Sequence, residues 1–156
     1  MEDGILFHKV RSNENNFIEL IAEWYLNEWD IPIEQTSKRL ANIPNDDVIF
    51  QLLLLKNNEP VATGGLYNKI NLLKVHPKFL KFKPWVALLY TTPQNRNRGF
   101  AEKLLFKIED IANELGFKEL YLHSFTAERL YLKNKWIAFD RVEYKEHITA
   151  VMKKEI

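Results

Sequence analysis

Residues 91–102 carry the most informative motif of this chain, and they read Thr91-Thr92-Pro93-Gln94-Asn95-Arg96-Asn97-Arg98-Gly99-Phe100-Ala101-Glu102. A loop rich in arginine and asparagine, followed by a glycine, separates an apolar segment from an amphipathic one. The N-terminus of a helix exposes unpaired N–H groups and about half a positive charge. With Arg96 and Arg98 beside it, this terminus predicts a cradle for a diphosphate, because Gly99 and Ala101 leave room for oxygens to approach the backbone.

This motif differs from two other phosphate-binding loops. A Walker loop requires Gly-Lys-Ser/Thr, and a dinucleotide fingerprint requires Gly-x-Gly-x-x-Gly; neither is present in residues 91–102. Taken alone, the segment is also compatible with an ordinary polar loop that precedes a helix, which is the less favoured interpretation.

Hydrophobic periodicity outlines the rest of the fold. A helix following Asn13 should end at Trp29-Asp30-Ile31-Pro32, and residues 33–43, 104–115 and 126–135 should form further helices. Strands are expected at residues 5–10, 48–56, 61–67, 85–91, 120–125, 139–144 and 148–153. The long helix between strands 85–91 and 120–125 allows these two to be parallel, and the hairpins imply antiparallel neighbours. The fold class is therefore α/β with a mixed, mostly antiparallel sheet.

Several single positions have a specific structural meaning. Asn13 and Thr126 are expected to cap the helices that follow them, and Gly116 to cap the C-terminus of helix 104–115. Gly64-Gly65 inside a strand predicts a bulge or a close backbone approach. The lysine-rich segment 68–84 is predicted to be irregular and long enough to be a functional loop.

Length and composition limit the possible classes of protein. With 156 residues, 46% of them hydrophobic, residues 1–156 are expected to form a single domain with one core. The absence of cysteine excludes disulfides, thiolate metal sites and a cysteine nucleophile, and the four histidines are scattered, so no metal site is expected. There is no apolar run of 18 residues, and the acidic N-terminus Met1-Glu2-Asp3-Gly4 lacks a signal-peptide pattern. These features predict a cytoplasmic protein without membrane association.

Charge is distributed unevenly along the chain, although the formal net charge is only +1. The segment 60–101 holds five lysines, two arginines and no acidic residue, whereas residues 12–37 hold six acidic residues and no lysine or arginine. A basic block of this kind indicates a polyanionic ligand such as nucleotide phosphates, nucleic acid or acidic lipid. The alternative is two solvated faces of opposite charge.

Two motifs together resemble the GNAT superfamily of N-acetyltransferases. Arg96-x-x-Gly99-x-Ala101 is similar to the family's Arg/Gln-x-x-Gly-x-Gly/Ala pyrophosphate signature, and it lies between a strand and a long amphipathic helix as in the family. Ala127-x-x-Leu130-Tyr131-x-Lys133 resembles the family's downstream tyrosine helix. The expected order of elements matches that of the family along nearly the whole chain.

The resemblance implies a site for acetyl-CoA where the fourth and fifth strands splay apart. Backbone groups of Leu89, Tyr90 and Thr91 would pair with the pantetheine arm. The diphosphate would be held by amides of Arg96, Asn97, Arg98, Gly99, Phe100 and Ala101. Tyr131 would protonate the departing CoA thiolate while a neutral amine attacks the thioester directly.

The chain departs from the family pattern at two places. Lys135, followed by Trp136, replaces the glycine that usually precedes the aromatic residue of the tyrosine helix. The fourth strand also lacks the carboxylate that helps many relatives to remove the amine proton. The general base is therefore open between Glu28, Asp30, His123 and a water chain, and Glu28 and Trp29 are expected to line the acceptor site.

The favoured hypothesis is an acetyl-CoA-dependent N-acetyltransferase acting on a primary amine of a small molecule or peptide. The alternative is a non-catalytic acyl-CoA sensor of the same fold. An RNA-binding module using residues 69–98 is a third hypothesis, and it lacks an RNA-binding motif, so no nucleic acid partner is expected. The acidic first two helices predict a cationic acceptor, whereas the acyl preference and the choice between monomer and homodimer stay open.

Overall fold

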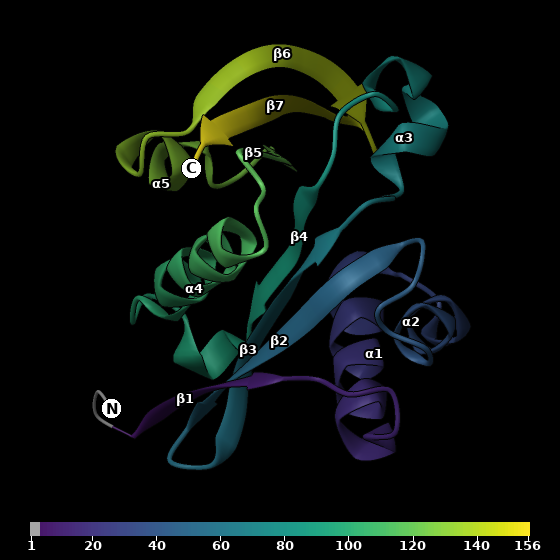
Figure 1. The fold of residues 1–156 in the computed structure, drawn as a ribbon, viewed down its shortest axis with the longest axis vertical. Helices are drawn as coiled ribbons and strands as arrows, with labels where there is room; N and C mark the ends of the chain where they lie inside the picture. The colour runs from purple at the N-terminus through teal and green to yellow at the C-terminus, as the bar shows by residue number, and fades with distance from the viewer. Residues whose placement is uncertain (1–3) are drawn as a thin grey trace.

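A seven-stranded sheet in the order β1-β2-β3-β4-β5-β7-β6 runs through the molecule (Figure 1). The computed structural model describes residues 4–156; Met1, Glu2 and Asp3 of the acidic N-terminus noted above lie outside the described residues. All neighbouring strands are antiparallel except β4 and β5, which are parallel. The predicted mixed sheet is therefore confirmed. Its strands are β1 (Ile5–Lys9), β2 (Val48–Lys56), β3 (Glu59–Tyr67), β4 (Trp85–Thr91), β5 (Glu119–Ser124), β6 (Ile137–Tyr144) and β7 (His147–Glu155).

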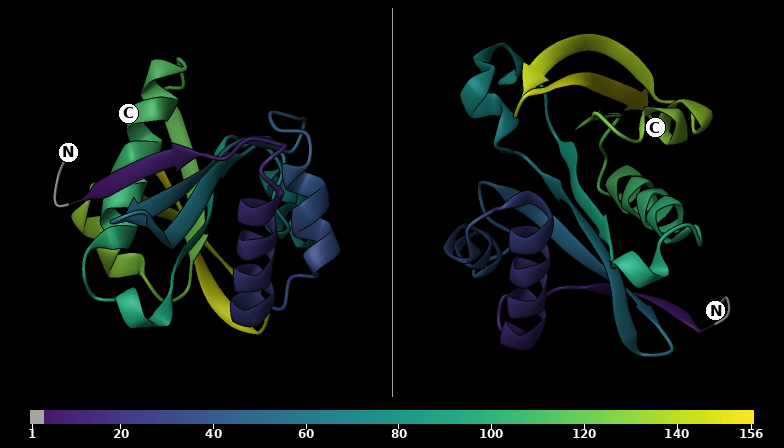
Figure 2. Two further views of the ribbon diagram at one scale, coloured as in Figure 1. Left: turned by 90° about the horizontal axis from the view of Figure 1, so that it is seen from below. Right: turned by 180° about the vertical axis from the view of Figure 1, so that it is seen from behind.

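Helices cover both faces of this sheet, as the views in Figure 2 show. The helices are α1 (Asn15–Trp29), α2 (Ile33–Leu40), α3 (Leu72–Val75), α4 (Phe100–Glu114) and α5 (Glu128–Lys133). One core packs α1, α2 and α3 on the first face, and a second core packs α4 and α5 on the other. Within residues 4–156, no helix combines the length and apolar character needed to cross a membrane.

The boundary between β4 and β5 is where the sheet opens. The two strands pair only at Trp85 and Tyr121, whereas β5 continues its pairing with β7 through Ser124. Beyond Trp85, the edge of β4 that faces β5 therefore has no strand partner. Such an unpaired edge leaves backbone N–H and C=O groups available to another extended chain.

A bulge in β4 lies beside this opening. Leu88 adopts a left-handed backbone with φ 59°, and the register of β3 against β4 shifts between Thr63 and Gly65. Opposite the bulge, a Cβ on Gly64 would lie 2.5 Å from Leu89 Cδ2, the flexible end of that side chain, whereas a Cβ on Gly65 would lie 2.7 Å from the backbone carbonyl oxygen of Phe50. The close approach predicted for Gly64-Gly65 is confirmed.

Both predicted N-caps are wrong, because Glu14 and Ala127 occupy the cap positions and neither helix has a side-chain hydrogen bond at its cap. α1 begins at Asn15 after Glu14 rather than after Asn13, and the Glu14 carboxylate accepts a hydrogen bond from the backbone N–H of Arg11 at 2.7 Å. α5 begins at Glu128, and Ser124 Oγ accepts from the backbone N–H of Ala127 at 3.0 Å, with no cap from Thr126.

Two predicted segments also have different extents. α2 ends at Leu40 instead of continuing to residue 43. Residues 68–84 are more ordered than expected: they contain α3 and a 3-10 turn at Pro77–Phe79. Phe79 is 2% exposed and packs edge-on against Trp85 and Phe139, which explains why a lysine-rich segment folds back onto the sheet.

Candidate active site

A cavity of about 220 Å³ lies where β4 and β5 separate. Its walls include residues 86–89 of β4 and residues 122–127 at the end of β5. Tyr131 borders it from the α5 side, and Trp29 and Ile31 border it from the α1 side. Since these residues belong to the cores on opposite faces, the cavity connects the two faces of the sheet.

The N-terminus of α4 offers a row of free backbone donors. Within residues 4–156, no amide from Asn97 to Glu102 has a protein acceptor, and the first bond of the helix is Lys103 N–H to the Gly99 carbonyl at 3.1 Å. Asn97 and Gly99 both have left-handed backbones, with φ 63° and 81°. Alternating conformations of this kind turn successive N–H groups toward a common point, which suits an anion with several oxygens.

Glycine is favoured at position 99 by the left-handed backbone conformation and not by crowding from neighbouring atoms. A Cβ built on it would meet nothing within 4 Å, because it would project into open space in front of the helix. A side chain there would cost strain from the positive φ. Phe100, by contrast, is 4% exposed and anchors the first turn of α4 in the core.

The two arginine side chains of the motif are engaged with the protein itself. Arg96 Nε donates to the Thr91 carbonyl at 2.9 Å, its guanidinium pairs with Glu28 at 3.2 Å, and it covers the ring of Tyr90. Arg98 donates to Asn95 Oδ1 at 2.9 Å. Both remain exposed, so they can support an anion, but the free amides are the better-placed donors.

The three β4 residues expected at the pantetheine arm differ in their surroundings. Leu89 lines the cavity. Tyr90 is buried on the α1 face, where its ring packs against Trp24 at 5.3 Å between centroids. The Thr91 carbonyl is already an acceptor for Arg96. Leu89 is therefore the one of the three whose side chain borders the opening.

Tyr131 presents a free phenol to the cavity. Tyr131 is 8% exposed and its ring packs against Trp136. No group within residues 4–156 forms a hydrogen bond with its hydroxyl, which borders the cavity. Burial raises the pKa of Tyr131 to about 12, so the hydroxyl keeps its proton across the neutral range. A protonated hydroxyl without a partner can donate to a group that enters the cavity.

Lys135 takes over the turn in which the family pattern has glycine. It adopts φ 74°, its N–H bonds the Leu132 carbonyl at 3.2 Å, and Trp136 N–H bonds the Tyr131 carbonyl at 3.0 Å. These two bonds define a Schellman ending of α5. The local turn is thus retained at the cost of placing a lysine in the left-handed region, and α5 still directs Tyr131 to the cavity.

A buried polar network holds the β4 bulge in place, and no local pattern of residues predicted it. Tyr25 donates its hydroxyl proton to the Leu88 carbonyl at 2.8 Å and accepts from Gln51 Nε2 at 2.9 Å. Gln51 also donates to Thr63 Oγ1 and accepts from Tyr67. Because every member is bonded, the network fixes the orientation of the bulge next to the cavity.

The candidates for a general base lie in different places. Glu28 is paired with Arg96, and the exposed Asp30 ends α1 in a left-handed conformation; neither lines the cavity. Trp29 and His123 do line it. Burial, with a further contribution from the charge of Lys145, lowers the pKa of His123 to about 4, which makes it a weak proton acceptor. Among residues 4–156, no three acidic or histidine side chains come together as a metal site.

The family model described as Acetyltransferase (GNAT) family matches residues 15–135. This chain therefore belongs to the GNAT acetyltransferase family. A search among curated proteins finds no match. The mixed sheet with its parallel, splayed β4 and β5 agrees with this family assignment.

Solved structures share the fold over almost the full length of the chain. Ard1 from Thermoplasma volcanium superposes with a TM-score of 0.72 at 12% identity, covering 98% of both chains. An aminoglycoside 6'-N-acetyltransferase complexed with coenzyme A gives 0.74 at 9% identity, covering 96% of both. Arabidopsis thaliana Naa50, in complex with a bisubstrate analogue, gives 0.68 at 17% identity, covering 98% of this chain and 99% of that one. At these identities the likeness concerns the fold.

Proposed function

We propose that the protein is an acetyl-CoA-dependent N-acetyltransferase that acetylates a primary amine of a small molecule or peptide by direct attack. The observation that carries this proposal is the row of free amides from Asn97 to Glu102, directly after a strand edge that faces the cavity. This arrangement fits a ligand with a diphosphate followed by an amide-containing arm. Among the superposed structures, one is described in complex with coenzyme A and one with a CoA-based bisubstrate analogue.

In this proposal each part of the site has its own role. The α4 amides, with Arg96 and Arg98, bind the diphosphate, and the open edge of β4 orients the pantetheine arm. The amine nitrogen forms a bond to the thioester carbon, and the carbon–sulfur bond breaks. The Tyr131 hydroxyl donates its proton to the sulfur and regains one from solvent, while the proton lost by the amine passes to solvent.

A second candidate is a non-catalytic acyl-CoA sensor of the same fold. It is favoured by the lack of any carboxylate among the cavity-lining residues and by the weakly basic His123. Such a protein would bind CoA through the same amides without turning it over.

Incubation with acetyl-CoA and a panel of amines, followed by measurement of free thiol, separates these candidates. Thiol release that depends on an added amine supports the transferase. Calorimetric binding of CoA without release supports the sensor. Absence of both binding and release would overturn the assignment of the α4 amides as a CoA cradle.

A further inference from the structure

The charged side chains that line the cavity include two permanent cations and no anion. Arg39 comes from α2, and Lys145 comes from the turn between β6 and β7. None of the lining residues is aspartate or glutamate. A concave site with this charge attracts an anionic group rather than a second cation.

Arg39 is held in a fixed position beside the cavity. It donates from Nη2 to Asn71 Oδ1 at 2.8 Å, and Asn71 Nδ2 donates in turn to Gln35 Oε1 at 3.1 Å, which sets the orientation of the Asn71 amide. The guanidinium also lies over the ring of Tyr67. Within residues 4–156, no carboxylate pairs with Arg39, so most of its five donors are available.

Both cations act on other residues of the cavity. Burial raises the pKa of Tyr144, and the charge of Arg39 opposes that rise. Lys145, which is exposed at the mouth, contributes to the lowered pKa of His123. Since Tyr144 and His123 both line the cavity, the two positive charges are close enough to act within it.

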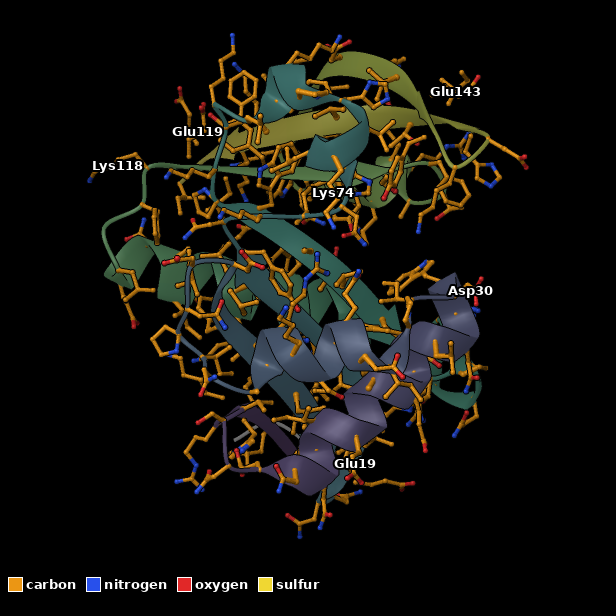
Figure 3. All side chains as sticks on the ribbon, turned by 90° about the vertical axis from the view of Figure 1, so that its right-hand side faces the viewer. Glu19, Asp30, Lys74, Lys118, Glu119 and Glu143 are labelled. Carbon is orange, nitrogen blue, oxygen red and sulfur yellow. The ribbon has the colours of Figure 1, made fainter. Side chains whose placement is uncertain are left out.

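The acidic residues in and next to α1 are not among the residues that line the cavity. Glu14 pairs with His8 at 2.8 Å, and Glu28 pairs with Arg96. Figure 3 shows Glu19 at the end of α1 farthest from the β6–β7 half of the molecule and Asp30 at the other end of the helix. Asp30 is exposed and lies between the cavity-lining Trp29 and Ile31, but it is not itself one of the lining residues.

We propose that the acceptor is an amino carboxylate, a primary amine whose own carboxylate is bound by Arg39 with additional attraction from Lys145. This inference rests on the proposed transferase function and names its substrate class. The planar fork of an arginine matches a carboxylate in two parallel hydrogen bonds. The same cations disfavour the protonated form of the amine, which helps to generate the neutral nucleophile where no carboxylate base is available.

The test compares amines that differ only in the anionic group. Each amino acid of a panel is assayed with acetyl-CoA beside its carboxamide and its decarboxylated amine, and thiol release gives kcat/KM. The two references have a less basic and a more basic nitrogen than the amino acid, so a preference over both cannot arise from amine basicity. We expect the carboxylate to raise kcat/KM by about 10- to 100-fold, as one or two charge-assisted hydrogen bonds would.

Variants of Arg39 test whether this residue causes the preference for the amino acid over its carboxamide. Arg39→Gln should reduce the ratio of acid to carboxamide to near one while activity on the carboxamide persists, and Arg39→Lys should leave an intermediate ratio. Lys38→Gln is the matched control, because Lys38 lies on the same helix outside the cavity lining, and it should keep the full ratio. Equal use of acid and carboxamide by the parent, or an unchanged ratio in Arg39→Gln, would overturn the proposal.

A binding measurement distinguishes failure of the acceptor inference from failure of the proposed transferase function. The CoA-bound protein is titrated with the same acids and carboxamides by calorimetry. If no amine releases thiol, the transferase assignment fails, and the acceptor inference fails with it. If turnover occurs, preferential binding of the acids that is lost in Arg39→Gln supports the inference, and equal binding of acids and carboxamides contradicts it.

Discussion

Gly99 and Gly116 lie at opposite ends of α4 in similar conformations. Both have positive φ, 81° and 93°, and a Cβ on either would meet nothing within 4 Å. Substitution at either position therefore costs a similar strain of about 1–2 kcal/mol. They differ in what they face, because only Gly99 adjoins the free amides at the N-terminus of the helix.

This pair gives a controlled test of the CoA cradle. Gly99→Glu places bulk and a negative charge in front of the amides, and we expect it to weaken CoA binding by about 10-fold or more. Gly116→Glu should lower stability by a comparable amount and leave CoA affinity unchanged. Calorimetric titration of both variants measures the difference, and equal CoA affinities would rule out the cradle at the N-terminus of α4.

Tyr131→Phe tests the proton donor. The hydroxyl has no partner within residues 4–156, so its removal should barely change stability or CoA affinity, whereas turnover should fall by about 10²–10⁴-fold. Thiol release and calorimetry on the same preparation measure the two effects. Tyr121→Phe is a suitable control, because Tyr121 donates its hydroxyl proton to Glu119 and lies outside the cavity lining. Full turnover in Tyr131→Phe would assign the proton donor to water or another group.

The ending of α5 shows how one element tolerates an unfavourable residue. Lys135 has φ 74°, a conformation that costs a residue with a side chain about 1 kcal/mol relative to glycine. Lys135→Gly should therefore raise the free energy of unfolding by about 1 kcal/mol, and the melting temperature by about 2–4 °C. Thermal unfolding followed by circular dichroism measures this change.

Lys133→Gly provides the opposite case two residues earlier. Lys133 is the last residue of α5 and pairs with Glu102, so glycine there should lower stability by up to about 1 kcal/mol. A loss of stability in Lys135→Gly would show that contacts of the lysine side chain outweigh the backbone strain.

At the scale of the whole molecule, the end of β5 places a half-buried histidine, His123, in the wall of the cavity between β4 and β5. Folding lowers the pKa of His123 from 6.5 to about 4, chiefly by burial. Between these values the unfolded chain binds a proton that the folded protein does not, so stability should fall as the pH drops from about 6.5 to 4. The full effect amounts to about 3 kcal/mol.

Urea unfolding at pH 7.5 and pH 4.5 measures this dependence. His123→Gln removes the titrating group, so its loss of stability between the two pH values should be smaller than that of the parent protein. Carboxylates such as Glu14 titrate in both proteins and cancel in the comparison. An identical pH dependence in parent and variant would show that folding does not lower the pKa of His123.

Local pattern along the chain was sufficient to predict several elements. β2 and β4 begin and end where predicted, because continuous apolar runs bounded by polar residues or proline favour buried strands. α4 and Gly116 were predicted from one amphipathic face followed by glycine, and both are confirmed. The helix starts were not predicted correctly: Asn13 and Thr126 are suitable caps by residue type, yet Glu14 and Ala127 occupy the cap positions and no side chain caps either helix.

Part of the candidate site was equally accessible from the sequence. The free amides from Asn97 to Glu102 follow from a loop-to-helix junction a few residues long. Tyr131 belongs to a short motif on one helix. Such features depend on neighbours in the sequence, and backbone conformation over a few residues is governed mainly by local sterics and hydrogen bonding.

The tertiary structure decided the charge and the shape of the cavity. Arg39, Asn71 and Lys145 lie far apart in the sequence and meet only because α2, residues 68–84 and the β6–β7 turn pack around the splayed strands. The acidic run in residues 12–37 predicted a cationic acceptor, but folding pairs Glu14 and Glu28 elsewhere. Which charges face a cavity is set by long-range packing, and a one-dimensional pattern of charges does not contain that information.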